Sequence, residues 1–197
     1  MSRLDEGRAR LLAAARRAAT ETAASRVSLR DIAKAAGLSP AACYRYFPSR
    51  ERLADALAAE VCAEIVAAAR GAAALETEPY ERLTAAAHAY LVYAVANRGA
   101  FDLAFERAEG DWAAAERSVA GAEIAHLFAD LAERPGAGPA LWGAVHGLVD
   151  LLIKGIIDVG QREHGASVIP SRGNTLMRGL LEGLLTSSAS RESRAAE

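Results

Sequence analysis

Apolar residues along this chain recur at helical spacing, and short stretches with Gly, Pro or Ser interrupt them. After Ser49, for example, apolar side chains return every three or four positions at Leu53, Leu57, Val61, Ile65 and Ala68. This period places side chains on one face of an α-helix. We predict helices at about residues 4–24, 28–46 (two short ones), 49–74, 80–96, 99–110, 111–133, 140–162 and 172–187, and a disordered tail at 188–197. The predicted fold is all-α, with roughly nine helices and no strand.

Composition agrees with this pattern and divides the chain in two. Alanine fills 48 of the 197 positions, and aromatic residues make up only 6%, which favours helices over sheets. Residues 1–52 hold 11 Lys and Arg against 5 Asp and Glu, whereas residues 53–197 hold 12 against 20. We therefore predict a basic N-terminal domain at 1–48 that contacts nucleic acid, and an acidic helical domain at 49–187 that begins with a linking helix at 49–74. The alternative is that this basic surface faces solvent and has no binding partner.

The segment at 28–53, SLRDIAKAAGLSPAACYRYFPSRERL, carries the strongest local signals. Ser28 and Ser39 are good helix N-caps, and Pro40 suits the first turn of the helix that follows Ser39. Gly37 stands where a helix end needs a residue that tolerates a left-handed backbone. Helix, glycine turn and helix in this order predict a DNA-binding helix-turn-helix.

These residues resemble the DNA-binding domain of the tetracycline-repressor (TetR) family of bacterial transcription regulators. The matching positions are Ile32-Ala33, Ala36-Gly37-Leu38-Ser39, Tyr44-Arg45-Tyr46-Phe47 and Ser49-Arg50-Glu51 with Leu53. The resemblance implies that the helix at 39–46 is the recognition helix in the major groove. It also implies that Tyr44 and Tyr46 grip phosphates and that Arg50, where the family usually has Lys, reaches the DNA backbone. For each tyrosine the alternative is a half-buried packing role.

The expected DNA contacts combine this resemblance with the side-chain chemistry. Ala41 and Ala42 can only meet thymine methyl groups, so direct readout of bases falls on Arg45 and Ser39, with Arg30 and Lys34 as further candidates. The full set of expected contacts is Ser28, Arg30, Lys34, Ser39, Pro40, Ala41, Ala42, Tyr44, Arg45, Tyr46 and Arg50. This set names duplex DNA as a partner without naming the operator sequence.

A homodimer is the second expected assembly, since repressors of this family bind palindromic DNA as dimers. The helix at 140–162 carries two adjacent apolar stripes, and the last helix adds a third beside Gly179 and Gly183. A helix this apolar is buried on more than one side, so we predict a four-helix dimer interface; the alternative is burial wholly within one subunit. The predicted contacts are Leu141, Val145, Leu148, Leu152, Ile156, Leu176, Leu180 and Leu184.

The larger domain is expected to bind a small-molecule effector. Trp142, His146 and Gly147 resemble the Trp-x-x-x-His-Gly signature of one subset of effector domains in the family. The candidates to line a ligand pocket are Tyr90, Tyr93, Phe101, Phe105, Trp112, His126, Phe128, Trp142 and His146. Plain core packing is the alternative for each of them.

Several classes of function lack their signals. The sequence has no nucleophile elbow, phosphate-binding loop or dinucleotide fingerprint, and His88, His126 and His146 have no metal-ligand spacing. Cys43 and Cys62 are expected to be buried apolar residues. No stretch is apolar enough to cross a membrane. We therefore expect a cytoplasmic ligand-responsive repressor, with no cofactor, metal or enzymatic activity. Alternatives are a helical ligand-binding or catalytic protein that does not bind DNA, an activator, and a regulator without an effector.

Overall fold

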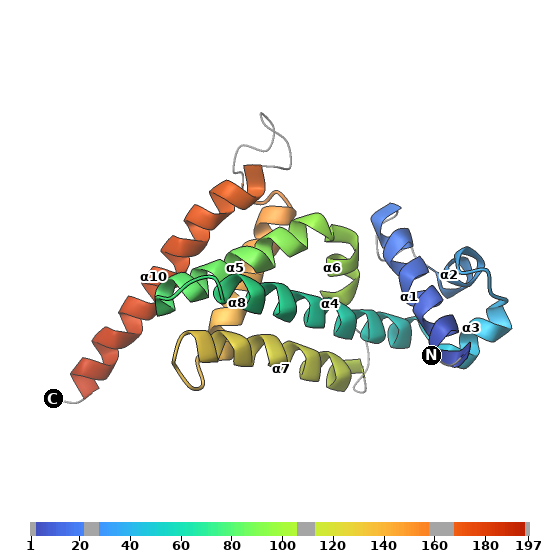
Figure 1. Ribbon diagram of the computed structural model, residues 1–197, viewed down its shortest axis with the longest axis horizontal. Helices are drawn as coiled ribbons and strands as arrows, with labels where there is room; N and C mark the ends of the chain where they lie inside the picture. Colours follow the sequence, from blue (N-terminus) through green and yellow to red (C-terminus); the bar gives the residue numbers. More distant parts are fainter. Residues whose placement is uncertain (1–2, 22–27, 106–112, 158–167, 196–197) are drawn as a thin grey trace. The chain divides into compact units, whose positions relative to one another are not determined.

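The computed structural model describes residues 3–21, 28–105, 113–157 and 168–195, and these residues form nine helices and no strand (Figure 1). The all-α fold is therefore confirmed. The helices are α1 (Arg3–Glu21), α2 (Leu29–Ala35), α3 (Pro40–Tyr46), α4 (Arg50–Ala73), α5 (Pro79–Ala96), α6 (Arg98–Phe105), α7 (Ala113–Leu131), α8 (Gly138–Ile153) and α10 (Val168–Ala195). They belong to two compact units: Met1–Glu64 with Asn97–Gly121, and Ile65–Ala96 with Ala122–Glu197.

The first unit is built around α1, which packs against α2, α3 and α6 (Figure 1). Leu11 and Leu12 of this helix are buried, as is Ile32 of α2. Gly99 of α6 lies directly on α1, because a Cβ atom added at Gly99 would stand 2.1 Å from the carbonyl oxygen of Ala19. Helix α6 thus packs with the N-terminal helices, although the sequence assigned it to the predicted domain at 49–187.

In the second unit α5 packs against both α8 and α10, and α8 packs against α10. Gly173 permits one close approach, since a Cβ atom there would lie 2.6 Å from Cδ2 of Leu91. An ion pair fastens α10 to the start of α5: the Arg178 guanidinium donates to both carboxylate oxygens of Glu81, each at 2.7 Å. The pair lowers the pKa of Glu81 through this hydrogen bond. Nearby, the Tyr80 hydroxyl donates to the carbonyl oxygen of Arg178 at 3.0 Å.

Two predicted helix boundaries are wrong. Helix α8 ends at Ile153 rather than near 162, because Gly155 adopts a left-handed backbone (φ 69°) and closes the helix. The N–H of Ile156 donates to the carbonyl of Leu151 at 2.9 Å, and that of Gly155 to Leu152 at 3.1 Å, which is the Schellman pattern. Helix α10 runs from Val168 to Ala195, so its helical backbone includes most of the tail that we predicted to be disordered.

Candidate DNA-binding surface

The segment at 28–53 adopts the backbone conformation that its local sequence signals predicted. The Ser28 hydroxyl accepts the N–H of Asp31 at 3.1 Å, and the Ser39 hydroxyl accepts the N–H of Ala42 at 3.1 Å. Gly37 has a φ of +67°, and its N–H donates to the carbonyl of Lys34 at 3.0 Å. Two capped helices joined by a left-handed glycine therefore follow from local interactions, and the predicted helix-turn-helix is confirmed.

Helix α3 presents one polar face to solvent and buries the other. Ala41, Tyr44 and Arg45 are exposed, with 54% of the Tyr44 surface accessible. Cys43 and Phe47 are buried, and burial raises the pKa of the Cys43 thiol. A tyrosine and an arginine held outward by a buried anchor form a surface suited to a phosphate backbone and base edges.

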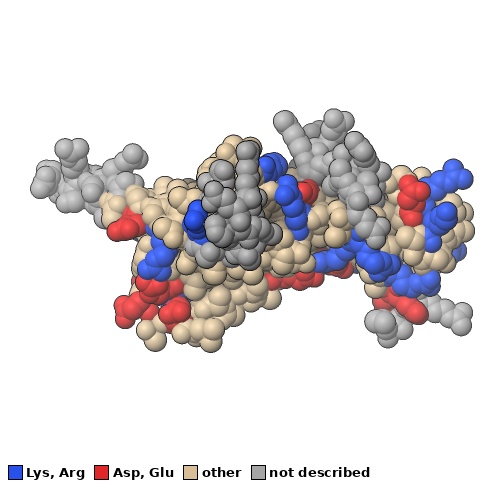
Figure 2. Space-filling model, turned by 90° about the horizontal axis from the view of Figure 1, so that it is seen from above, with Lys and Arg blue, Asp and Glu red and all other residues tan. Residues whose placement is uncertain are grey.

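A hollow of about 580 Å³ lies beside the start of α3. The residues that line it are Arg30, Asp31, Lys34, Gly37, Leu38 and Pro40. Arg30 and Lys34 stand one turn apart on α2, so their positive charges lie on one face. Figure 2 shows Lys and Arg side chains over the part of the chain that holds α2 and α3. The structure thus brings three of the expected contacts together: Arg30, Lys34 and Pro40.

One acidic residue of this surface was missed in the sequence analysis. The Ser28 hydroxyl donates to the Asp31 carboxylate as well as accepting its N–H. The carboxylate therefore already complements the positive end of the α2 dipole. The Ser-x-x-Asp pattern at 28–31 resembles a capping box and could have shown this. Asp31 reduces the attraction that this helix end exerts on a phosphate.

The remaining expected DNA contacts are less exposed. Ala42, Tyr46 and Arg50 are half-buried. The Tyr46 ring lies against α1, because a Cβ atom at Gly7 would be 2.3 Å from the Tyr46 hydroxyl oxygen. This contact between Tyr46 and α1 agrees with the alternative given above, in which Tyr46 is a packing residue. The contact of Tyr46 with DNA stays a prediction.

Three of the candidate ligand residues form a polar cluster in the second unit. The Tyr90 hydroxyl is 2.7 Å from Nδ1 of His146, and the Trp142 indole N–H donates to the same hydroxyl at 3.4 Å. Tyr90 is fully buried, whereas Trp142 and His146 are partly exposed. Burial lowers the pKa of His146; the charge of Asp150 opposes this shift and that of Lys154 adds to it. His146 is therefore neutral near pH 7.

The other candidates lie apart from this cluster. Phe101 and Phe105 belong to the first unit, where their ring centroids are 4.7 Å apart. Phe128 is fully buried, Tyr93 is half-buried and His126 is exposed. Trp112 lies outside the described residues. The described candidates therefore belong to two different units.

The predicted dimer contacts have unequal exposure in the single chain. Leu141, Val145 and Leu152 are buried within it, as the alternative of burial in one subunit requires. Ile156 is 67% exposed and lies beyond the end of α8, so its placement on the helical stripe is wrong. Leu176 is 41% exposed. Leu148, Leu180 and Leu184 are half-buried. Whether these residues contact a partner stays a prediction.

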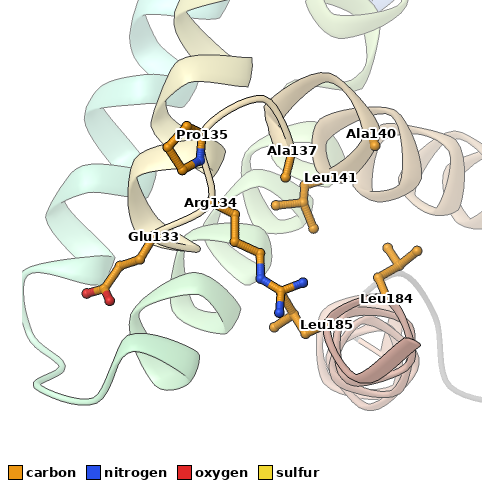
Figure 3. Close-up of a pocket in the computed structure, with 8 residues that line it drawn as sticks. All are labelled: Glu133, Arg134, Pro135, Ala137, Ala140, Leu141, Leu184 and Leu185. Atoms are coloured by element: carbon orange, nitrogen blue, oxygen red, sulfur yellow. The ribbon is translucent and has the colours of Figure 1, made fainter. Parts of the chain in front are cut away.

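Two of these leucines meet at a groove of about 510 Å³ in the second unit (Figure 3). Its lining residues are Glu133, Arg134, Pro135, Ala137, Ala140, Leu141, Leu184 and Leu185. The Arg134 side chain extends toward Leu185, while Glu133 points away from the groove (Figure 3). Arg134 follows Glu133, which takes a left-handed backbone (φ 53°) at the end of α7.

Among the described side chains, no three or more His, Cys, Asp or Glu gather closely enough to hold a metal ion. No helix in the described ranges has the length and apolar character needed to span a membrane.

The fold and the exposed face of α3 define a DNA-binding protein of the helix-turn-helix class. A family model described as bacterial regulatory proteins of the tetR family matches residues 11–57, and one described as a tetracyclin repressor-like C-terminal domain matches residues 83–168. The chain belongs to the TetR family of bacterial transcription regulators.

Solved structures share the fold at low sequence identity. A tetR-family regulatory protein from Rhodococcus RHA1 has a TM-score of 0.70 and 19% identity, over 91% of this chain and 97% of that one. The regulator PfmR from Thermus thermophilus has a TM-score of 0.62 and 19% identity, over 85% and 96%. The fatty acid degradation regulator FadR from Bacillus halodurans has a TM-score of 0.65 and 17% identity, over 86% and 97%. A search of curated protein sequences found no match. These structural relatives are regulators rather than enzymes.

Proposed function

We propose that this protein is a transcriptional repressor that binds a palindromic operator as a homodimer and leaves it when a small molecule binds. The observation that carries the proposal is the exposed face of α3, where Tyr44 and Arg45 project from a helix anchored by buried Cys43 and Phe47. In a dimer, two such helices would enter successive major grooves about 34–36 Å apart.

DNA binding is tested with purified protein and duplexes from the DNA upstream of its coding sequence. Footprinting locates the operator, and fluorescence anisotropy compares it with a scrambled duplex at several salt concentrations. We expect a preference for the operator and a steep fall in affinity with salt, because several phosphates are neutralised. The variant Arg45→Ala should lose the preference, whereas Arg70→Ala, which removes an exposed arginine of α4, should keep it. A shallow salt dependence without preference for any duplex would contradict DNA regulation.

The dimer proposal rests on the apolar residues that α8 and α10 leave accessible. Leu176 is 41% exposed, and Gly179 and Gly183 on the same helix have no atom within 4 Å of an added Cβ atom, which leaves room for a second helix. Light scattering at micromolar concentration should give the mass of a dimer. Leu176→Glu should shift it toward the monomer. Leu75→Glu is the matched control, since Leu75 is 84% exposed and follows α4. A monomeric wild-type protein would argue against the dimer.

For the effector, we propose that Trp142 and His146 form the polar part of the binding site. They are partly exposed, and they share a hydrogen-bonded cluster with buried Tyr90. Ligand sites are commonly apolar with a few converging polar groups. A metabolite panel should yield a compound that raises the melting temperature and releases DNA. The response should weaken in His146→Asn and persist in His126→Asn, which changes an exposed histidine.

A further inference from the structure

One turn of α1 holds the C-terminal ends of both helices of the helix-turn-helix. The guanidinium of Arg10 donates through Nη2 to the carbonyl oxygen of Ala36, the C-cap residue of α2. The Arg8 guanidinium lies 5.5 Å from the ring centroid of Phe47, the C-cap residue of α3. The Tyr46 hydroxyl packs directly against Gly7, where an added Cβ atom would be 2.3 Å from its oxygen. Residues within four positions of each other therefore touch the end of each helix.

The contact of Arg10 is directed at the turn itself. The carbonyl of Ala36 stands at the negative end of the α2 dipole, where a cation is favourable. The next residue, Gly37, has a φ of +67°, and a Cβ atom there would be 2.9 Å from Nη2 of Arg10. Glycine suits this position for two reasons: it adopts the left-handed backbone without strain, and it has no Cβ atom in the space that the Arg10 guanidinium occupies. The turn is fixed by its own hydrogen bonds and by a side chain 26 residues earlier in the chain.

We propose that Arg10 is a positioning residue for DNA recognition, which fastens the turn between α2 and α3 to α1 and so sets the orientation of α3 without contacting DNA. This inference rests on the proposed function, in which α3 reads the operator. It also changes how the basic charge of the N-terminal domain is interpreted. Arg8 and Arg10 are engaged with Phe47 and Ala36, and Arg16 pairs with Glu64 at 2.7 Å. The number of phosphates neutralised should therefore be smaller than the count of basic residues suggests.

The test separates a positioning residue from a phosphate contact through the dependence of operator affinity on salt. Arg10→Met keeps an unbranched apolar stem and removes the charge and the donors of the guanidinium. Arg17→Met is the control, since Arg17 is exposed two turns further along α1. We expect Arg10→Met to weaken operator binding on the order of tenfold, the effect of one charge-assisted hydrogen bond. Binding to scrambled DNA and the slope of log affinity against log salt should stay as in the wild type. Arg10→Lys, which keeps a charged donor, should recover part of the loss.

A different slope would overturn the proposal. Each lost phosphate contact lowers the slope by about 0.9, so a decrease of that size, with equal weakening on operator and scrambled DNA, would make Arg10 a phosphate contact. Unchanged operator affinity in Arg10→Met would also overturn it.

Amide hydrogen exchange tests the same contact without DNA. The N–H groups of Gly37 and Leu38 donate to carbonyls of α2, and their exchange should be faster in Arg10→Met than in Arg17→Met or the wild type. Equal exchange in all three proteins would overturn the positioning role, even if the wild type binds no DNA. Absence of wild-type DNA binding combined with faster exchange would instead contradict the proposed function alone.

Discussion

The Tyr90 hydroxyl lies 2.7 Å from Nδ1 of His146 and also accepts the indole N–H of Trp142 at 3.4 Å. An indole nitrogen can only donate, so the Tyr90 oxygen accepts from Trp142. The direction of the bond between Tyr90 and His146 follows the tautomer of His146. Two side chains of α8 thereby converge on one buried hydroxyl of α5.

Removing the Tyr90 hydroxyl should destabilise the protein. Tyr90→Phe takes away the acceptor of Trp142 and the hydrogen-bond partner of His146 at a fully buried position. We expect a loss of about 1–3 kcal/mol in the free energy of unfolding, measured by chemical denaturation. The matched control is Tyr80→Phe on the same helix, whose half-buried hydroxyl makes a hydrogen bond to Arg178. An equal effect of the two substitutions would argue against the cluster.

The stability of the wild type should decrease below pH 6.5 because of His146. Burial lowers its pKa in the folded protein below the ordinary value of 6.5. As the pH falls through 6.5, the unfolded chain takes up a proton at this residue before the folded chain does. The free energy of unfolding therefore falls with pH in this window and is fully retained above it.

His146→Asn isolates this contribution from the other histidines. The asparagine amide can accept a hydrogen bond from Tyr90 or donate one to it, but it does not titrate. The difference in stability between the wild type and this variant, measured from pH 5 to 8, should shrink as the pH falls. A difference that is constant with pH would show that His146 titrates alike in the folded and unfolded states.

Gly99→Ala should disturb the packing of α6 on α1. The added Cβ atom would lie 2.1 Å from the Ala19 carbonyl oxygen, a backbone atom that cannot turn aside. Overpacking of this kind costs roughly 1–3 kcal/mol. Gly71→Ala is the opposite case, because nothing lies within 4 Å of its Cβ position in α4. It should stabilise the protein by up to about 1 kcal/mol. Thermal melts of both variants test the pair.

The ion pair between Arg178 and Glu81 should contribute little and only at low salt. Both side chains are half-buried, so solvent screens their attraction. A double-mutant cycle of Arg178→Met and Glu81→Gln should give a small favourable coupling that declines as salt is added. A large coupling that salt leaves unchanged would place the pair in a drier environment than its exposure indicates.

Arg45 and Tyr44 should affect DNA binding differently. Arg45→Ala should lower operator affinity by about 1–3 kcal/mol and relax the preference for operator, because arginine reads base edges. Tyr44→Phe should weaken binding to every duplex alike, because a hydroxyl bound to phosphate carries no sequence information. Competition assays with operator and random DNA distinguish the two. Equal losses on both DNAs for Arg45→Ala would contradict its assigned role.

The candidate site was predictable where it depends on neighbours in the chain. Ser28, Gly37 and Ser39 act on backbone groups up to four positions away, so their residue types alone indicated two capped helices and a turn. The end of α8 shows the limit of this reasoning. An unbroken apolar stripe predicted a helix through 162, yet the single left-handed Gly155 ends it. The apolar spacing continued to Ile156, which is 67% exposed beyond the end of α8, so the apolar pattern alone did not mark where the helix stops.

The sequence by itself thus determined the all-α class and the helix-turn-helix, because capping and helical periodicity operate within one or two turns. Only the tertiary structure decided which distant side chains meet. Arg10 reaches Ala36 across 26 positions, Tyr90 reaches His146 across 56, and Arg178 reaches Glu81 across 97. Such contacts depend on how whole helices pack, since any apolar stripe can be buried against several partners. Packing also placed α6 on α1 through Gly99, a position where the sequence alone shows only a break between helices.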